Sequence, residues 1–481
     1  MSITSAINSA MSGLNAASRS SQIVSENLAN ALTPGYTRRT LDLNANAYSP
    51  GVRIGAVQRM VDPGVVSARR DSEAEYAVAE VNATFYARMS SLVGSVDDES
   101  SIASQMANFD GSLVETLSRP DSTPRLNDLA VKADLLVRSI TDAADGLRDM
   151  RVQADTSIGI QVDKVNSTLK ELEKLNARVV VAKAAGADTT TLLDQRSMLV
   201  DEINAIIPVN VINRDGGRIA LYSSGGTALL EGKASELSFS PKSDMLPHMT
   251  QDNGLLSGLE VNGKPISTSA NGPIRGGTLV AQFQVRDVLA VKAQDDLDAF
   301  ARDLIERFQD PALDSTIGAT DAGIFTDGGN FFDSADTVGI SGRLELNDLV
   351  AMDGQAETWR FRDGLYAATQ GDPGDGSLIN GYAEALKENR SLSSTGLGSV
   401  SGDASTLSSV LLSRFARDDN SASNTLTFAA ASYTEMAQTE ASFGVDTDAE
   451  LQNLMLYEKA YGANAKVLSV VDGLLETILG I

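Results

Sequence analysis

The chain of 481 residues contains no cysteine and only one histidine, His248. Without cysteine there can be no disulfide, thiolate nucleophile, iron–sulfur cluster or cysteine zinc site. A single histidine cannot build a multi-histidine metal site, and a serine–histidine–aspartate triad would have to use this one residue. His248 follows Pro247 in a turn-like stretch. We therefore expect it to lie in a solvated loop.

Aromatic residues are also scarce, at 5% of the chain with one tryptophan, so the core must be aliphatic and rich in alanine. Basic residues are outnumbered, since 39 Lys and Arg against 64 Asp and Glu give a net charge of −25. A chain this acidic is repelled by phosphate backbones, so we expect no nucleic acid partner. No apolar run reaches the length of about 18 residues that a membrane span needs, so we expect no membrane insertion. The first residues lack the basic and apolar regions of a cleaved signal peptide.

No residue pattern in the chain indicates catalysis. The glycine-rich segments have neither a Walker lysine nor a GxGxxG spacing. The acidic stretch Asp321–Asp336 lacks the spacing of a calcium loop, so it is predicted to be a solvated loop. No carboxylate pair stands in an apolar context that would raise its pKa. We therefore expect no enzyme activity, no cofactor and no metal site.

What the chain does have is a strict seven-residue repeat at each end, in which apolar or small residues alternate in steps of four and three. This spacing is typical of the seam of a coiled coil. The one polar C-terminal position, Asn464, would fix the register at some cost in stability. The N-terminal seam consists of Ile3, Ile7, Ala10, Leu14, Ala17, Ser21, Val24 and Leu28, and the C-terminal seam consists of Leu454, Tyr457, Tyr461, Asn464, Leu468, Val471, Leu475 and Ile478.

The two ends carry opposite charges. Residues 1–60 contain five arginines and two acidic residues, whereas residues 431–481 contain eight acidic residues and two lysines. Opposite charges favour association of the ends, within a chain or between chains. The alternative is that two peripheral helices pack on a globular core. Because one free helix cannot bury its apolar stripe, we expect both ends to be disordered in the free subunit and to order on assembly.

The predicted fold is mainly α: a discontinuous bundle of long helices with coiled-coil-forming terminal helices and a small β-rich insertion. Hairpin signals at Asp215–Gly217 and Asn262-Gly263 define the insertion, and we expect few core contacts to cross it. Residues 310–345 and 370–402 are rich in Gly, Asp and Ser and are predicted to be loops. The expected parts are terminal helices 1–45 and 441–481, a helical body 46–206 and 274–440, and an outer insertion 207–273.

Residues 25–39 read Ser-Glu-Asn-Leu-Ala-Asn-Ala-Leu-Thr-Pro-Gly-Tyr-Thr-Arg-Arg. This segment resembles the N-terminal motif of the bacterial flagellar axial proteins, the rod, hook and hook-associated subunits. Near the other end, two tyrosines spaced by four and the following Ala463-Asn464-Ala-Lys466-Val resemble the family's C-terminal pattern. The segments Leu192–Ile203 and Gly276–Leu279 are most similar to the hook-associated subunits that join hook to filament.

The resemblance implies that terminal helices from many copies line an inner tube, from which the other domains point outward. It implies a ring of copies, contacts with the hook protein and with the third hook-associated protein, a cytoplasmic export chaperone at the C-terminal region, and type III export to the flagellum outside the cell. A hook or rod subunit of the same family is the alternative, and so is a type III secreted effector or translocator, which would not explain the Pro-Gly-Tyr turn.

The resemblance and the seams together predict the residues of the assembly interface. Asn27 and Asn30 are expected to form hydrogen bonds at the end of the first helix, and Gly35 is expected to supply a backbone angle that other residues avoid. The predicted interface comprises Ile3, Ile7, Leu14, Val24, Asn27, Leu28, Asn30, Pro34, Gly35, Tyr36, Leu454, Tyr457, Tyr461, Asn464, Leu468, Val471, Leu475 and Ile478.

Overall fold

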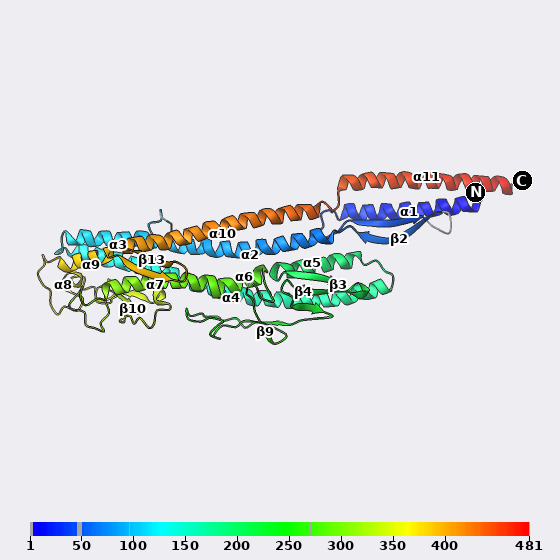
Figure 1. Ribbon diagram of the computed structural model, residues 1–481. Helices are drawn as coiled ribbons and strands as arrows, with labels where there is room; N and C mark the ends of the chain where they lie inside the picture. Colours follow the sequence, from blue (N-terminus) through cyan, green and yellow to red (C-terminus); the bar gives the residue numbers. More distant parts are fainter. Residues whose placement is uncertain (1–2, 46–50, 96, 270, 481) are drawn as a thin grey trace.

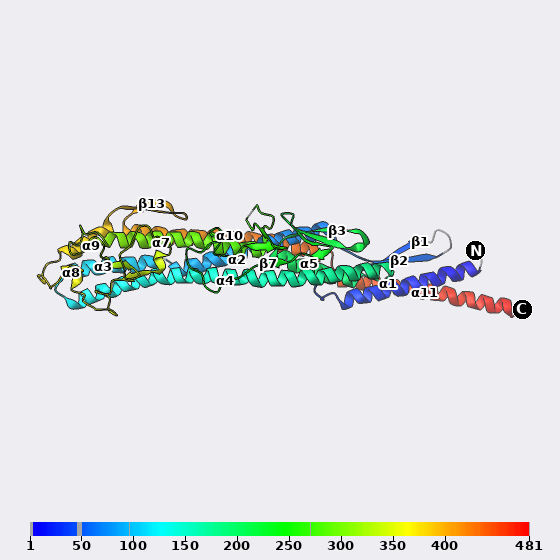
Figure 2. The same cartoon turned by 90° about the horizontal axis from the view of Figure 1, so that it is seen from below.

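The computed structural model describes residues 3–45, 51–95, 97–269 and 271–480, so Met1, Ser2 and Ile481 of the terminal ranges lie outside it. The molecule is elongated, with its long helices running along one axis (Figures 1 and 2). The two chain ends lie side by side at one end of the molecule (Figure 1). The prediction of a mainly helical protein with long helices and small sheets is confirmed.

The helices begin where the sequence supplies capping groups. Asp62, Asp403 and Asp446 each accept backbone N–H groups of the first turn of the helix that follows. The terminal helices are α1 (Ile3–Ala29) and α11 (Thr447–Leu479). The helices between them are α2 (Pro63–Val93), α3 (Ile102–Leu117), α4 (Thr123–Ala184), α5 (Thr190–Ile206), α6 (Gly277–Gln284), α7 (Ala290–Phe308), α8 (Arg360–Asp363), α9 (Ser377–Lys387) and α10 (Ala404–Ala441), with a π-helical turn Val285–Leu289 between α6 and α7 and short 3-10 turns at Asp215–Gly217 and Ile340–Gly342.

The body is organised around α4, which buries apolar residues along its length, from Leu126 to Val179. Its first half packs with α3, α7, α9 and the start of α10 in one core cluster. Phe109, Phe308 and Phe325 meet edge to face in this cluster. Of the buried aromatic residues in the described part of the chain, all except Phe283 belong to this cluster.

The insertion forms two antiparallel sheets, and both predicted hairpin turns are present. The expectation that few core contacts cross it is wrong. Its residues Leu221, Leu230 and Leu259 are buried in one cluster with Val165 and Leu169 of α4. The second half of α4 would expose this apolar face without the insertion, so the insertion is part of the body. The strands are β3 (Val209–Asn213), β4 (Ile219–Ser223), β5 (Ala228–Glu231), β6 (Lys233–Ala234), β7 (Leu237–Ser238), β8 (Leu259–Val261) and β9 (Lys264–Ile266).

A buried ion pair ties the insertion to the body. Arg286, in the π-helical turn, and Asp155, on α4, both have fully buried side chains, and the guanidinium lies 2.6 Å from the carboxylate. The other Asp155 oxygen accepts the backbone N–H of Lys242 at 2.6 Å. Arg286 also donates to the carbonyl of Ser257 at 3.1 Å. Helix α4, the π-helical turn and the loop between β7 and β8 therefore share one polar cluster.

Two other expectations need correction. The stretch 370–402 is not all loop, because α9 places Ile379, Tyr382, Ala383 and Leu386 on one buried face. The segments 310–345 and 370–402 also contribute strands of two hairpins, β10 (Phe325–Asp327) with β11 (Leu344–Leu346) and β12 (Arg390–Ser394) with β13 (Gly398–Gly402). A further hairpin, β1 (Arg39–Ala45) with β2 (Val52–Arg59), spans the boundary expected between residues 45 and 46 and packs along α1.

Among the described helices, none has the length together with the hydropathy that crossing a lipid bilayer requires.

Candidate assembly interface

The N- and C-terminal helices pair with each other within one chain. Helices α1 and α11 run antiparallel, and α1 also carries the β1–β2 hairpin (Figure 1). Helix α1 consequently buries several residues, among them Val24 and Asn27. Both seams therefore find a partner before a second copy is present, which differs from the expectation of disordered ends. Each end supplies the apolar stripe that the other needs.

Most C-terminal seam positions lie on the inner side of α11. Val471 is only 7% exposed, and Leu454, Tyr457, Asn464, Leu468 and Leu475 are half-buried. Tyr461 and Ile478 are about half exposed, so they do not share the buried seam. A straight helix drifts by about 20° per heptad against a strict repeat, which turns positions near the end of the seam, such as Ile478, away from the partner.

Asn464 meets α1 at a glycine. A β-carbon placed on Gly13 would lie 2.7–2.8 Å from the side-chain amide of Asn464. Only glycine allows α1 to approach that amide so closely without a shift. The Asn464 amide donates to the Ala460 carbonyl of its own helix at 3.0 Å, and Gly13 leaves the space that the amide occupies.

The opposite side of α11 is apolar and exposed. Its large side chains are Leu451, Met455, Leu456, Val467, Val470 and Leu474, each between 45% and 61% exposed. We call these six residues the outer face of α11. Exposed apolar side chains that gather on one side of a helix are typical of a surface that binds another molecule.

Asn27 is the hub that joins the two terminal helices to the turn after α1. Its amide is buried and donates to the Arg39 carbonyl at 2.9 Å and to Glu450 Oε2 at 3.2 Å. Its carbonyl oxygen accepts the Tyr36 hydroxyl at 2.9 Å and the Arg39 N–H at 3.0 Å. Glu450, itself buried, also accepts Arg38 Nε at 2.7 Å. The α1 end, the turn and α11 are thus locked through one amide and one carboxylate.

The turn after α1 depends on Gly35, which has a positive φ of 74° as expected. A β-carbon there would also lie 2.4 Å from Met198 Sδ on α5. Asn30 donates its amide to the Glu26 carbonyl at 2.9 Å and so satisfies a carbonyl of the last helical turn. Pro34 is exposed between these two residues.

Asp194, on α5, fastens the turn and the hairpin to the body. It accepts the Thr37 hydroxyl at 2.6 Å, and its carboxylate lies 2.7 Å from Arg59 and 3.4 Å from Arg39. The Arg59 guanidinium also donates to the Thr37 hydroxyl at 2.9 Å. One buried carboxylate therefore connects the segment after α1 with the far strand of the hairpin.

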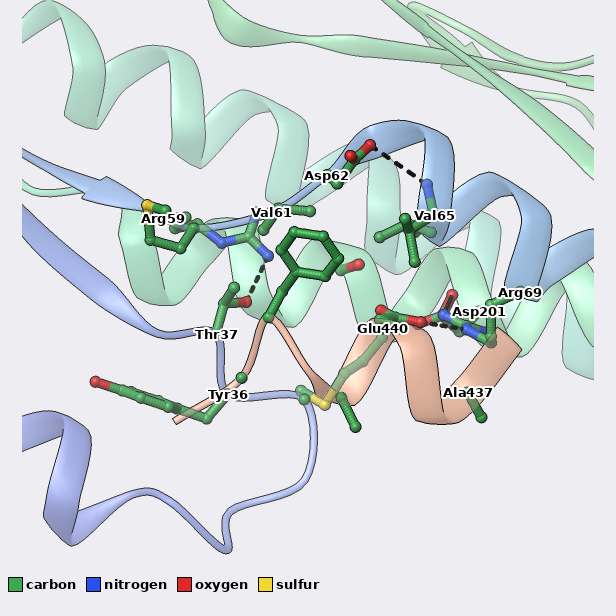
Figure 3. A pocket seen from close by; sticks show the side chains of 18 of the residues that line it. Tyr36, Thr37, Arg59, Val61, Asp62, Val65, Arg69, Asp201, Ala437 and Glu440 are labelled. Carbon is green, nitrogen blue, oxygen red and sulfur yellow. Dashed lines mark hydrogen bonds and ion pairs between the residues drawn. The ribbon is translucent and has the colours of Figure 1, made fainter. Parts of the chain in front are cut away.

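A second ion cluster lies where the terminal pair meets the body, beside a pocket of about 470 Å³ (Figure 3). Arg69 of α2 donates to Glu440 of α10 at 2.7 Å, to Asp201 of α5 at 2.8 Å and to Glu73 at 2.7 Å. Burial opposes the charged guanidinium, but Asp201 and Glu440 outweigh it and raise the pKa of Arg69. Asp201 also accepts Arg70. Three body helices are held together at this joint.

Gly35→Ala should lower the stability of the turn by about 1–3 kcal/mol, because it adds backbone strain and a contact with Met198. Hydrogen exchange of α1 and of residues 30–38 measures this loss. Gly186→Ala is the matched control, since Gly186 has a φ of 68° and no atom within 4 Å of an added β-carbon. Equal losses in the two variants would show that the approach to Met198 is unimportant.

The structure brings together the turn and hub residues that the sequence indicated, but it adds partners that the sequence analysis left without a role. Asp194 lies within the resembling segment Leu192–Ile203, and Glu450 precedes the two C-terminal tyrosines; both prove to be the carboxylates that hold the turn. Gly13 and the outer face of α11 were missed, because a glycine inside a helix and a second apolar stripe are visible only once α1 is placed. Among the described residues no cluster of three potential metal ligands occurs, and His248 lies exposed in a loop.

The fold and this site define a structural subunit that is built to assemble: an elongated helical body with paired terminal helices and an uncovered apolar face. Residues 86–332 match the model of the flagellar hook-associated protein FlgK helical domain, which covers half of the chain. Residues 7–37 match the flagella basal body rod protein model, and residues 437–481 match the C-terminal model of the flagellar basal body rod FlgEFG proteins. The chain belongs to the flagellar hook-associated protein FlgK family.

Individual relatives agree with this assignment. Flagellar hook-associated protein 1 of Escherichia coli K12 is 30% identical over 287 residues, 56% of this chain and 52% of that protein. The chain thus spans about half the length of that relative. Flagellar hook-associated protein 1 of Bacillus subtilis 168 is 22% identical over 94% of this chain and 93% of that protein. The solved structure of the flagellar hook junction protein FlgK from Burkholderia pseudomallei aligns over 56% of this chain and 47% of that chain, with 19% identity and a TM-score of 0.44.

Proposed function

We propose that this chain is a structural subunit of the bacterial flagellum that joins the hook to the filament, and that it has no catalytic role. The observation that carries the proposal is the exposed outer face of α11 on a pair of helices whose seam is already filled within the chain. Burial of such a face stabilises an assembly by about 25 cal/mol per Å² of apolar surface. Since the partner helix α1 already covers the inner side of α11, we propose that a second subunit covers the outer face.

In this arrangement the residues proposed to contact a neighbouring copy differ from the seam residues that the sequence indicated. Inner seam residues such as Val24, Asn464 and Val471 hold the pair together, whereas Val470 and Leu474 on the outer face would contact a second copy. The hub of Asn27 and Glu450 keeps the pair in register with the turn. The seam residues are therefore proposed to support assembly from within the subunit.

The proposed partners are copies of this chain in a ring, the hook protein on one side and the third hook-associated protein on the other, with a cytoplasmic export chaperone at the C-terminal region before export. The proposed place is outside the cell, at the hook–filament junction. Support comes from both terminal segments matching rod protein models, since subunits that share terminal segments can continue one axial packing. A type III effector or translocator would leave these matches unexplained.

Deletion of this protein should give cells with hooks of normal length that lack filaments, with filament subunits released into the medium. Negative-stain electron microscopy and blots of the medium measure both results. A plasmid copy of the wild-type chain should restore filaments. Normal flagella in the deletion strain would contradict the proposal, and loss of the hooks themselves would favour the hook or rod alternative.

A further inference from the structure

A groove of about 930 Å³ lies between helix α1 with its β1–β2 hairpin and the part of the body formed by the end of α4 and the start of α5. One wall is formed by Arg19 of α1 and by the β1–β2 hairpin. The other wall is formed by the end of α4, by the start of α5 and by the β3–β4 turn. The groove thus adjoins the paired termini that are proposed to assemble.

The groove is cationic on a chain whose net charge is −25. Its lining contains Arg19, Lys183, Arg196 and Arg214, against Asp188 and Asp215. Arg214 is paired with Glu231 at 3.0 Å, and Asp188 accepts the Thr190 N–H at 2.8 Å. Within the described part of the chain, no carboxylate lies within 4.0 Å of the charged groups of Arg19, Lys183 or Arg196.

Arg196 is a cation of the groove whose acceptors are both uncharged. It donates to the Gly217 carbonyl at 2.6 Å and lies 3.5 Å from Asn176 Oδ1, both uncharged acceptors. Burial, followed by the like charge of Arg59, lowers the pKa of Arg196 to about 10. Arg196 is only partly exposed to water, and within the described part of the chain its acceptors are uncharged, so its charge has no carboxylate partner.

We propose that this groove is a contact site for a second copy of this chain, whose carboxylate side chains pair with Arg19, Lys183 and Arg196. The inference rests on the proposed function and names a second surface of the same assembly. Charge complementarity favours a second copy as the partner, because every copy carries a net charge of −25. Copies with the same negative charge repel each other when they pack side by side. Cations at the contact would reduce this repulsion by pairing with carboxylates of the neighbour.

Cross-linking in assembled flagella tests the proposal. The chain is free of cysteine, so Lys183→Cys carries a single thiol to which benzophenone maleimide can be attached. Illumination of purified flagella should give dimers of this chain, with the cross-link mapped by mass spectrometry to an acidic segment of the second copy. Free subunits at the same concentration should give none.

A charge reversal provides the second measurement. Arg19→Glu with Lys183→Glu should reduce the number of filaments per hook about tenfold with an unchanged melting temperature, since like charges would then meet across the contact. Lys264→Glu, on β9 outside the groove, is the matched control and should leave filament number unchanged.

Cross-links only to a different protein would overturn the assignment of the partner. So would the absence of cross-links at Lys183→Cys in flagella where the same reagent at Val470→Cys gives dimers. If both positions fail and the chain is missing from purified flagella, the proposed function itself is wrong.

Discussion

Val470→Asp should leave the free subunit as stable as the wild type and leave hooks without filaments. Val470 lies on the outer face of α11 and is 58% exposed, so the carboxylate stays in water in the free subunit. In the assembly the same position would be covered by a neighbour. Burying an unpaired carboxylate costs several kcal/mol, enough to prevent a contact that each subunit repeats. Urea unfolding and electron microscopy of hooks measure the two effects.

The next residue provides the control. Val471 has the same side chain but faces α1 and is 7% exposed. Val471→Asp should therefore destabilise the terminal pair in the free subunit as well as abolish filament attachment, and hydrogen exchange of α1 should rise. Lys466→Ala, an exposed charge on α11, should be mild. Equal loss of stability in Val470→Asp and Val471→Asp would mean that both sides of α11 are buried within the free subunit.

Arg286→Met should cost about 3–5 kcal/mol in the free energy of unfolding, the largest effect on stability that we expect from a single substitution in the body. The change keeps an apolar stem and removes the charge that faces Asp155, which would be left with the Lys242 N–H. Removing one partner of a buried pair leaves the other charge uncompensated. Urea unfolding followed by circular dichroism measures the loss.

The matched control is Arg214→Met, which breaks the Arg214–Glu231 pair on the insertion. Both side chains of that pair are nearly half exposed. Exposed pairs contribute about 0–1 kcal/mol, so this variant should unfold close to the wild type. Partial restoration of stability in the double variant Arg286→Met with Asp155→Ala would support the explanation by an unpaired charge, since Asp287, which also pairs with Arg286 at 2.8 Å, keeps its charge. A small loss in Arg286→Met would contradict the view that the cluster joins insertion and body.

The long helices could be predicted because their periodicity is a local property of the sequence. The seven-residue pattern located α1 and α11, and turn residues such as Asn262-Gly263 located a hairpin. Helix α9 was missed because its apolar face of four residues is embedded in a stretch whose composition is typical of loops. The relation of the insertion to α4 was missed because Leu221 and Leu169 meet only after the chain has folded back.

At the candidate site, too, local features could be predicted from the sequence, whereas contacts between distant segments could not. The positive φ of Gly35 follows from the turn motif itself. The partners of Asn27 and Thr37 lie 423 and 157 residues away in Glu450 and Asp194, and no local pattern pairs them. The seams correctly indicated helices that need partners, but they left open whether the partner belongs to the same chain. In the structure, each terminal helix has the other terminal helix of the same chain as its partner. The proposed contact between subunits is therefore the outer face of α11.

The outer face of α11 should become covered when the subunit assembles. Because the chain has no cysteine, Leu474→Cys introduces one thiol on that face, and Lys264→Cys introduces one on the insertion. The rate of maleimide labelling is then compared between free subunits and purified flagella. We predict that Leu474→Cys reacts readily in the free subunit and is protected in flagella, while Lys264→Cys reacts readily in both. Equal labelling of Leu474→Cys in free and assembled protein would contradict the account.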